Sequence, residues 1–404
     1  MSLLSINTIE SNSQHKRSQN DDFFFKMKPL TSILTPYFKA LFIMKKIILG
    51  AATGTFVLIF VLALLFSPSP IDSAAWTPPI APKLADVTVQ NNLLASADLL
   101  AKGNIYGPED VAIDQQGRLY GGTQDGLIKR VLTDGSVETW VNTQGRPLGL
   151  HFDGNNNLIV CDAYKGLISI NPQGEITTLT TSADGIPFVF TDDLDIASDG
   201  KIYFTDASSK WNQANYMLDL LETKPYGRFL VYDPATKKTT TLIDKMYFSN
   251  GVALSQQEDF VLVNETWRYK IIRYWLKGDK AGSHDIFADN LPGFPDGISS
   301  NRNGRFWVAF PTLRLPTVDK LHPTPWLKNI SAKLPASLKP KPIDYGLVLA
   351  LDEEGNIEGS LHDPSGETLK EITSAQEHKG FLYLGTLHND RIGRLDLAKV
   401  KWIN

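Results

Sequence analysis

Oxygen-bearing side chains recur at one position of a pattern that this 404-residue sequence repeats six times. In chain order, that position holds Glu109, Leu148, Asp192, Asn250, Asp296 and Ile372. If the six copies meet in space, three carboxylates lie together and disturb one another's pKa values. A hard divalent cation removes that repulsion, and oxygen donors without Cys or His indicate Ca²⁺ rather than zinc or copper. The pattern therefore predicts a Ca²⁺ site with the ligands Glu109, Asp192, Asn250 and Asp296.

Such a site could also perform chemistry. A bound Ca²⁺ would polarise a carbonyl or phosphoryl oxygen as a Lewis acid. One of the carboxylates could then act as a nucleophile or general base, provided that one of its oxygens stays free of the metal. Asn264 is a candidate to orient substrate near the metal. The simpler alternative is that Asp and Asn are common where strands begin, but Glu109 is a weak turn residue and fits that alternative poorly.

β-structure must position these residues. Each copy of the pattern is a short apolar alternation, a polar turn, a second apolar run and another turn. The turn residues, eight positions after the starts, are Gly117, Asn156, Gly200, Glu258, Gly304 and Gly380. Apolar runs such as 202–204 and 260–263 follow them. Alternation with period two between turn residues is typical of β-strands.

Starts spaced by about 40 to 75 residues, each with three or four short strands, are typical of propeller blades. The sequence therefore predicts an all-β fold, a six-bladed β-propeller over residues 84–404. An extra strand near 86–89 is expected to close the ring onto the last blade. A β-sandwich would not repeat one unit six times, and a β-helix would need a shorter period. Because the innermost strands of a propeller start at the same end of its channel, the four oxygen donors should converge.

A single transmembrane or signal-anchor helix is predicted before the propeller. Residues 47–66 are uncharged and match the roughly 20 residues that cross about 30 Å of hydrocarbon. Seven Lys or Arg against three Asp or Glu between Met1 and Lys46 predict a cytoplasmic segment 1–46. The propeller is then expected on the extracytoplasmic side, periplasmic or lumenal. The alternative is secretion after cleavage at Ser73-Ala74-Ala75, and Met44 is an alternative start.

Two other stretches stand apart from the repeat. Residues 67–83 begin with Ser67-Pro68-Ser69-Pro70 and are predicted to form a stiff Pro-rich linker. Residues 311–342 are a Pro- and Lys-rich insertion after blade five, predicted to form a lid or to contact an anionic membrane surface. A solvated loop is the alternative for this insertion. A second insertion, in blade three around Trp211 and Tyr216, is expected to wall the same pocket.

Composition excludes several classes of protein. Hydrophobic residues make up 42% and charged residues 21%, which is ordinary for a globular chain. Forty basic residues against 44 acidic ones give no attraction to nucleic acid. The single cysteine, Cys161, excludes an internal disulfide framework and a multi-Cys zinc site. The expected partners are a small-molecule substrate and, through the N-terminal helix, a membrane.

Several motifs resemble those of the strictosidine synthase-like family over about residues 100–398. The matching runs include Gly107-Pro108-Glu109-Asp110, Gly145-Arg146-Pro147-Leu148-Gly149, Asp162-Ala163-Tyr164-Lys165-Gly166-Leu167, Phe248-Ser249-Asn250-Gly251-Val252 and Phe294-Pro295-Asp296-Gly297-Ile298. The family belongs with the gluconolactonase, paraoxonase and diisopropyl fluorophosphatase group of six-bladed propellers. A membrane-associated member of the family is similar in layout, with an apolar helix before the propeller.

The resemblance implies a Ca²⁺-dependent hydrolase of lactones, aryl esters or phosphotriesters. Glu109, Asn250 and Asp296 match calcium ligands of that group, and Asp192 stands where those enzymes usually have Asn. Asp296 also matches the proposed nucleophile or base of gluconolactonase-like relatives. A histidine pair of the paraoxonase type has no match here. His151 is a candidate substrate-binding partner only, and its alternative role is a strand residue that lines the channel.

Hydrolysis of esters or lactones is the function expected from these observations, and two alternatives stay open. One is a non-catalytic, membrane-anchored binding module whose Ca²⁺ merely ties the blades together. The other is condensation of the strictosidine synthase type. For that reaction the family's catalytic glutamate falls near Thr373, with Glu371 two residues away.

Overall fold

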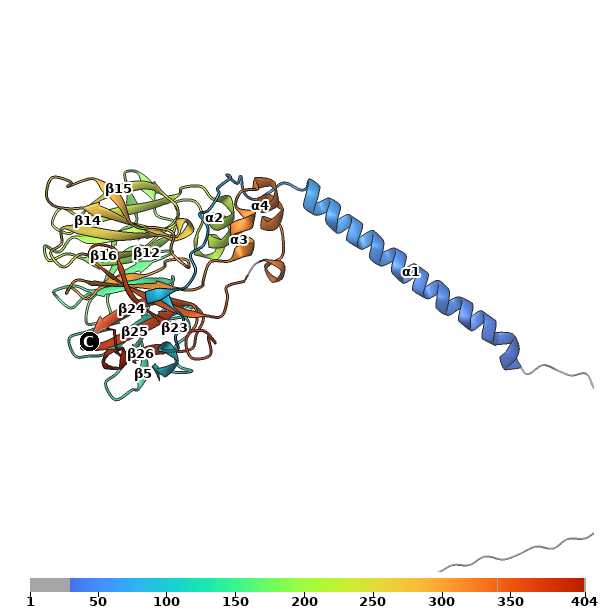
Figure 1. The fold of residues 1–404 in the computed structure, drawn as a ribbon, viewed down its shortest axis with the longest axis horizontal. Helices are drawn as coiled ribbons and strands as arrows, with labels where there is room; N and C mark the ends of the chain where they lie inside the picture. The colour runs from blue at the N-terminus through green and yellow to red at the C-terminus, as the bar shows by residue number, and fades with distance from the viewer. Residues whose placement is uncertain (1–29, 340, 403–404) are drawn as a thin grey trace, which may run out of the picture. The chain divides into compact units, whose positions relative to one another are not determined.

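The computed structural model describes residues 30–339 and 341–402, and the chain divides into two compact units, Met1–Ser67 and Pro68–Asn404 (Figure 1). The described part of the first unit is one helix, α1 (Leu30–Phe66). Its stretch Leu34–Phe66 is long and apolar enough to cross a membrane, as expected. The helix begins before the predicted residue 47, and Met44 lies inside it. Residues 1–29 of the expected cytoplasmic segment lie outside the described residues.

Among the described residues, the second unit contains six four-stranded antiparallel sheets. The predicted six-bladed β-propeller is therefore confirmed. Blade one consists of β2 (Val111–Ile113), β3 (Leu119–Gly122), β4 (Leu127–Val131) and β5 (Val137–Asn142). Blade two consists of β6 (Pro147–Phe152), β7 (Leu158–Asp162), β8 (Gly166–Ile170) and β9 (Ile176–Thr180). Blade three consists of β12 (Thr191–Ile196), β13 (Ile202–Asp206), β14 (Gly227–Asp233) and β15 (Lys238–Met246). A small hairpin, β10 (Ser182–Ala183) and β11 (Ile186–Pro187), separates blades two and three.

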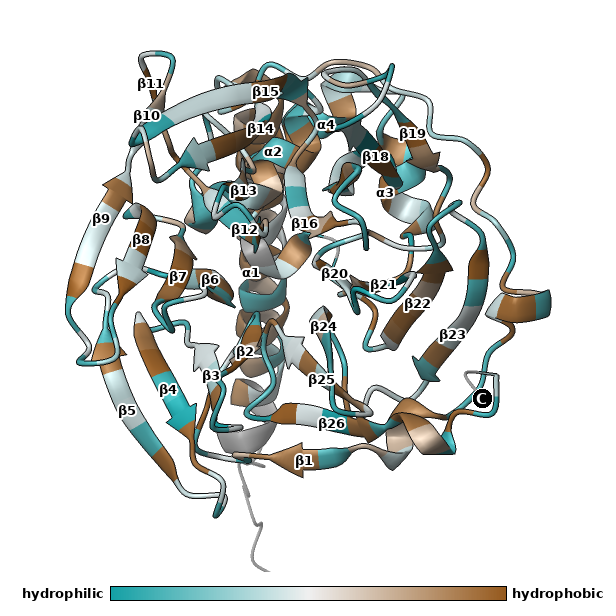
Figure 2. Ribbon diagram, turned by 90° about the vertical axis from the view of Figure 1, so that its left-hand side faces the viewer, coloured by the Kyte–Doolittle hydropathy of each residue, from teal (hydrophilic) through white to brown (hydrophobic). Residues whose placement is uncertain are grey.

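Blades four to six complete the ring. Blade four consists of β16 (Ser249–Leu254), β17 (Phe260–Glu265), β18 (Lys270–Trp275) and β19 (His284–Ala288). Blade five consists of β20 (Ile298–Ser300), β21 (Arg305–Phe310), β22 (Gly346–Asp352) and β23 (Ile357–Asp363). Blade six consists of β24 (Ile372–His378), β25 (Phe381–Thr386), β26 (Ile392–Asp396) and β1 (Asp98–Leu100). Figure 2 shows the first strand of each blade nearest the centre of the wheel and the last strand at its rim.

Side chains of alternate strand residues pack toward the two neighbouring blades, which explains the period-two pattern. In β17, Val261 and Val263 pack against blade three, whereas Phe260 and Leu262 pack against blade five. Each such buried side chain stabilises the fold by about 1.5–3 kcal/mol. The core therefore consists of several clusters that lie between adjacent blades rather than one central core.

The turn between the first two strands of each blade has the same backbone in all six copies. The six predicted turn residues all have positive φ, between 52° and 85°. Four of them are glycine, which adopts this conformation without a Cβ penalty. Asn156 and Glu258 adopt it in the other two blades. The repeat read from the sequence therefore has the expected boundaries.

The ring is closed by a strand from the N-terminal side, but not by the one expected. Residues Asp98–Leu100 pair with β26 and complete blade six, whereas Asp86–Thr88 form a 3-10 turn. Asp86 has a φ of 52°, and the Thr88 hydroxyl donates to the Ala85 carbonyl at 2.7 Å. Such a local side-chain bond competes with strand pairing. The prediction of a closing strand at 86–89 was therefore wrong in position.

Two interrupting segments fold against the propeller. The insertion at 311–342 contains α3 (Pro316–Leu321) and α4 (Pro325–Ala332), and blade three contributes α2 (Tyr216–Glu222). These three helices, hereafter the lid helices, pack beside one another at one side of the propeller (Figure 1). Part of the predicted Pro-rich linker packs against the propeller unit, because Ile71 is only 5% exposed and contacts residues of the lid helices.

Candidate functional site

The four predicted oxygen donors line one cavity of about 110 Å³. Asp192 and Asn250 are the second residues of β12 and β16, and Glu109 and Asp296 precede β2 and β20 by two residues. Pairing of β12 and β16 with their neighbours is irregular just after these positions. Such bulges re-aim side chains at the rims of sheets. The propeller therefore brings together side chains from blades one, three, four and five.

Glycine allows the inner strands to approach one another closely at this end of the channel. A Cβ on Gly251 would lie 2.4 Å from the Asp296 carbonyl oxygen. Because glycine has no Cβ, the Gly251 amide can donate a hydrogen bond to that oxygen at 3.0 Å. The Asn264 side-chain amide donates to the same oxygen. Asn264 is fully buried and does not line the cavity, so the structure places it behind Asp296, where it holds the Asp296 backbone.

The acids in the cavity are buried without the partners that buried carboxylates usually have. Among the described residues, no hydrogen bond reaches the carboxylate of Glu109 or Asp192, and Asp296 Oδ1 is buried without a partner. Burial, and then the charge of Asp296, raise the pKa of Glu109 well above its usual value. Burial and the charges of Glu109 and Asp296 do the same to the pKa of Asp192. Burial raises the pKa of Asp296 to about 7, and a hydrogen bond with the Asn250 side chain offsets part of that rise.

The next residues along two of these strands are also acidic but are fully bonded. Asp110 accepts the amides of Val111 at 2.7 Å and Leu150 at 2.9 Å. Asp193 accepts the amides of Leu194 at 2.8 Å and Val252 at 2.9 Å. Each of these carboxylates therefore ties the inner strand of its own blade to that of the next blade. Their neighbours Glu109 and Asp192 have no such structural use.

A buried arginine, which the sequence analysis did not select, lies behind the acids. Arg146 is 2% exposed, and its Nη1 donates to the carbonyls of Gly107 at 3.1 Å and Gly122 at 3.3 Å. Its Nε and Nη2 are buried without a partner. Burial lowers the pKa of Arg146, while the charges of Glu109 and Asp192 raise it. A charged residue two positions before Leu148, in a run of apolar residues and glycines, was the available signal.

Apolar and aromatic side chains form the rest of the cavity wall. They come from inner strands and the loops before them, from the turn after β17, and from α2 and α3, and they include Leu148, Phe190, Met217, Phe248, Trp267 and Phe294. The rings of Phe248 and Trp267 lie 4.4 Å apart. Tyr216 from α2 and Val318 from α3 also line the cavity, as expected of the two insertions. The site therefore combines a charged floor with a hydrophobic wall, which suits an apolar ligand with one polar group.

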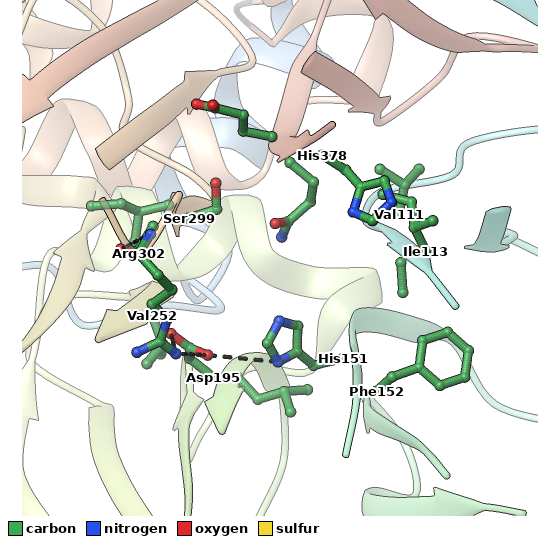
Figure 3. A pocket seen from close by; sticks show the side chains of 15 residues that line it. Val111, Ile113, His151, Phe152, Asp195, Val252, Ser299, Arg302 and His378 are labelled. Atoms are coloured by element: carbon green, nitrogen blue, oxygen red, sulfur yellow. Dashed lines mark hydrogen bonds and ion pairs between the residues drawn. The ribbon is translucent and has the colours of Figure 1, made fainter. Parts of the chain in front are cut away.

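His151 lies in a different cavity. This second cavity has a volume of about 230 Å³ and is also lined by Asp195, Arg302 and His378 (Figure 3). His151 Nδ1 lies 3.6 Å from Asp195 Oδ1. Residues such as Ile298 and Ser299 line both this cavity and a small space of about 10 Å³ that borders Glu109. The structure therefore places His151 at the other end of the channel from the four oxygen donors.

The residues suit a hard cation in their chemistry, although they do not form a closed cage. Within residues 30–339 and 341–402, no three Asp, Glu, His or Cys side chains lie close enough to hold a metal alone. The amide oxygen of Asn250 belongs to the donor set as well. The unpaired Oδ1 of Asp296 and the unbonded carboxylates of Glu109 and Asp192 are oxygen donors without another partner. Such a set fits Ca²⁺, which accepts carboxylate and amide oxygens in flexible geometry.

Thr373 and Glu371, the positions expected for the catalytic glutamate of a condensation reaction, provide no unpaired carboxylate at the floor of the cavity. The Thr373 hydroxyl donates to the Glu109 carbonyl at 2.6 Å and so links blade six to blade one. Glu371 is 8% exposed and is hydrogen-bonded to His388. Neither residue lines the cavity that holds Asp296.

Comparison with known proteins gives matches to families, relatives and structures. The "Strictosidine synthase" family model matches residues 192–279, and "Strictosidine synthase-like, N-terminal" matches residues 89–131. Adipocyte plasma membrane-associated protein of Rattus norvegicus is 38% identical over 363 residues, which cover 84% of this chain and 96% of the rat protein.

Solved structures with the same fold are more distant in sequence. A gluconolactonase from Xanthomonas campestris has a TM-score of 0.56 and 17% identity, covering 82% of this chain and 99% of that one. A calcium-binding protein, regucalcin, from Agrobacterium tumefaciens has a TM-score of 0.51 and 12% identity, covering 74% of this chain and 92% of that one. At these identities the likeness shows the propeller fold alone.

Proposed function

This chain belongs to the strictosidine synthase-like family, and from that membership and the geometry of the cavity we propose that it is a Ca²⁺-dependent hydrolase of esters or lactones. The observation that carries the proposal is a set of buried carboxylates at the floor of an apolar cavity: Glu109 and Asp192 receive no hydrogen bond from the described residues, and Asp296 keeps an unpaired Oδ1. A protein that used these acids only for its fold would bond them, as it bonds Asp110 and Asp193. Buried acids with perturbed pKa values in a cleft are typical of functional sites.

The cation would be held by Glu109, Asp192, Asn250 and Asp296. Three carboxylates carry a charge of −3 and Arg146 adds +1, so these side chains together carry −2, which a divalent ion balances. Bound there, Ca²⁺ would supply a Lewis acid for a substrate carbonyl oxygen. Regucalcin, which has the same fold and is a calcium-binding protein, supports the proposal of a calcium ion in this propeller.

Asp296 is the proposed catalytic residue. Its backbone is fixed by the Gly251 amide and by the Asn264 side chain, so its carboxylate has a defined position. One of its two oxygens would bind the cation, and the other would then be available to attack a carbonyl carbon or to take a proton from water, since Oδ1 has no hydrogen-bond partner among the described residues. In this proposal Asn264 is a positioning residue for Asp296, and His151 has no part in binding the substrate.

The hydrophobic wall would hold the apolar part of the substrate. Phe190, Phe248 and Trp267 offer aromatic surface but few hydrogen-bonding groups. An aryl or alkyl ester, or a lactone with an apolar ring substituent, would therefore bury its carbon skeleton there and direct its carbonyl toward the acids. A polyhydroxylated substrate would leave hydroxyl groups unpaired against this wall, at about 1–3 kcal/mol each.

The test is turnover by the full-length chain in detergent, with phenyl acetate and a simple lactone as substrates. We expect turnover that disappears with EDTA, returns with Ca²⁺, and falls by about 10³-fold in Asp296→Asn. Asp352→Asn is the matched control, because Asp352 accepts only local turn amides and lies in blade five. An unchanged rate in Asp296→Asn would contradict the assignment of this residue.

One observation favours the non-catalytic module as the second candidate. The four donors come from four blades, so a cation held by them would tie the ring together even without chemistry. In that case Ca²⁺ would raise the melting temperature of the chain, yet no ester, lactone or phosphotriester would be turned over. The same preparation therefore distinguishes the two candidates.

The proposed location is a membrane, with α1 as a single-pass anchor and the propeller on the extracytoplasmic side. The basic residues before the uncharged stretch 47–66 support this orientation, since seven Lys or Arg precede residue 47 against three acids. Protease added to sealed vesicles should cleave the propeller only when it lies outside. Cleavage solely after the membrane is opened, in vesicles of known cytoplasmic-side-out orientation, is the expected result.

A further inference from the structure

The stretch that follows α1 is bound to the lid helices along much of its length. We call residues 69–80 the strap; it begins three residues after Phe66, the last residue of α1. Ile71 is 5% exposed and packs with Leu221 of α2 and Ala332 of α4. A flexible linker would leave such a side chain in water, so this part of the chain is folded with the propeller.

Hydrogen bonds of backbone and side chains join the strap to all three lid helices. The amides of Asp72 and Ala74 donate to Glu222, to its Oε1 at 3.1 Å and to its carbonyl at 2.9 Å. The Trp76 amide donates to the His322 carbonyl, just after α3, at 3.2 Å. The Ser73 hydroxyl donates to the Pro325 carbonyl, at the start of α4, at 2.9 Å.

A buried lysine makes α4 depend on the strap. Lys328 is fully buried, and its Nζ donates to the Ala74 carbonyl at 2.5 Å and to the Thr223 hydroxyl at 2.8 Å. No carboxylate is paired with this ammonium group among the described residues. Without the strap it would keep a single hydroxyl acceptor in the interior, and an incompletely bonded buried charge is costly.

Trp76 supports α3 from the same side. Its ring lies 5.0 Å from the His322 ring and 5.7 Å from the Tyr269 ring, and the Arg268 guanidinium lies 4.2 Å above it. Trp76 packs against the apolar cluster that contains Phe248 and Trp267, and these two residues line the cavity. The strap therefore touches the backs of the elements whose fronts form the cavity wall.

We propose that the strap is a fixed part of the lid and a determinant of which substrates fit the cavity. The working form of the protein then keeps residues 69–80 intact, and cleavage at Ser73-Ala74-Ala75 does not produce it. Substrate choice is read through the hydrolysis proposed above, and so this part of the inference rests on that function. The packing of the strap and its integrity do not depend on the proposed function.

Hydrogen exchange and ester selectivity of the full-length chain test the strap together. Trp76→Ala should speed amide exchange in α3 and α4 by at least about tenfold and change the rate ratio for 4-nitrophenyl octanoate over 4-nitrophenyl acetate by about tenfold. Trp76→Phe should restore most of both effects. Ile80→Ala is the control, because this strap side chain is 93% exposed, and it should change neither.

The possible outcomes separate this inference from the proposed function. If wild-type protein hydrolyses neither ester, the proposed function fails, while exchange in α3 and α4 still tests the strap. Unchanged exchange in Trp76→Ala would overturn the structural part, and faster exchange with an unchanged ratio would overturn the role in specificity. Peptide mapping of protein from membranes should find uncut peptides across residues 70–80; a mature terminus at 74–76 would overturn the uncut form.

Discussion

The two ends of the propeller channel use the same kinds of residue in opposite ways. Asp192 and Asp195 lie three residues apart on β12 and are 3% and 5% exposed. Asp195 accepts the Leu254 amide at 2.8 Å and two bonds from Arg302 Nη2, at 2.8 and 2.9 Å. Asp192 receives no hydrogen bond from the described residues. One acid is part of the scaffold, whereas the other is free for a ligand.

The difference shows that burial and residue type alone do not reveal a functional acid. Both ends hold buried acidic residues, and the end with His151 even has the larger cavity. Charge at that end is already balanced inside the protein, because Arg302 pairs with Asp195. Charge at the end with Glu109 and Asp296 is balanced only in part, by Arg146. Substitutions at the two ends should therefore differ in what they do to stability and to Ca²⁺ affinity.

Asp195→Ala should be the most destabilising change. It leaves Arg302 without its main partner and the Leu254 amide without an acceptor, at a cost of about 3–5 kcal/mol of unfolding free energy. Urea denaturation measures the loss, while ester turnover by the folded fraction should persist. Asp199→Ala is the control, since that exposed ion pair with Lys201 should be worth under about 1 kcal/mol. Equal stability of the two variants would mean that the Asp195 network is not structural.

Asp219 in α2 is an intermediate case, because only neutral groups bond it. Ser208 donates to it at 2.6 Å and Trp267 at 3.0 Å, and burial raises its pKa to about 7. The folded chain therefore holds a proton that the unfolded chain releases near pH 4. Stability from this group should fall by about 2–3 kcal/mol as pH rises from 5 to 8.

Asp219→Asn should remove that slope, measured as the difference from wild type by denaturation at several pH values in saturating Ca²⁺. The amide can still accept the Trp267 bond, so the fold should persist. Parallel curves for variant and wild type would show that Asp219 is ionised in the folded protein throughout this range.

Arg146→Met tests the internal countercharge. Loss of its bonds to the carbonyls of Gly107 and Gly122 should cost about 1–2 kcal/mol of stability in the absence of metal. Removal of a positive charge beside Glu109 and Asp192 should strengthen Ca²⁺ binding by about tenfold. Calorimetric titration with Ca²⁺ measures the affinity, and Arg146→Lys, which keeps the charge, should stay near wild type. Weaker binding in Arg146→Met would reverse the assigned role.

Asp192→Asn should have the smallest effect on stability, and of opposite sign. Removing one of three mutually repelling charges should stabilise the metal-free chain by about 1 kcal/mol. The amide keeps an oxygen donor, so Ca²⁺ binding should weaken without disappearing. Thermal melts with and without Ca²⁺ measure both effects. A destabilised metal-free variant would indicate that Asp192 has a structural partner after all.

The sequence predicts the features that depend on repetition. Gly117 and its five counterparts could be located because each blade needs the same left-handed turn. The convergence of Glu109 and Asp296 in one cavity followed from the symmetry of the ring. The closing strand could not be placed, because three residues from Asp98 to Leu100 are too few to show a period. The strap has the composition of a linker, and only the contacts of Ile71 and Trp76 distinguish it.

Ring closure by β1 has a consequence for biosynthesis. Asp98 bonds with Arg394, 296 residues later in the chain, so blade six cannot form until nearly the whole protein has left the ribosome. At about 5–20 residues per second, the early strand waits on the order of 15–60 s with its edge unpaired. During that interval the nascent chain is exposed to mispairing, and we expect it to depend on chaperones more than a protein whose first and last strands are neighbours.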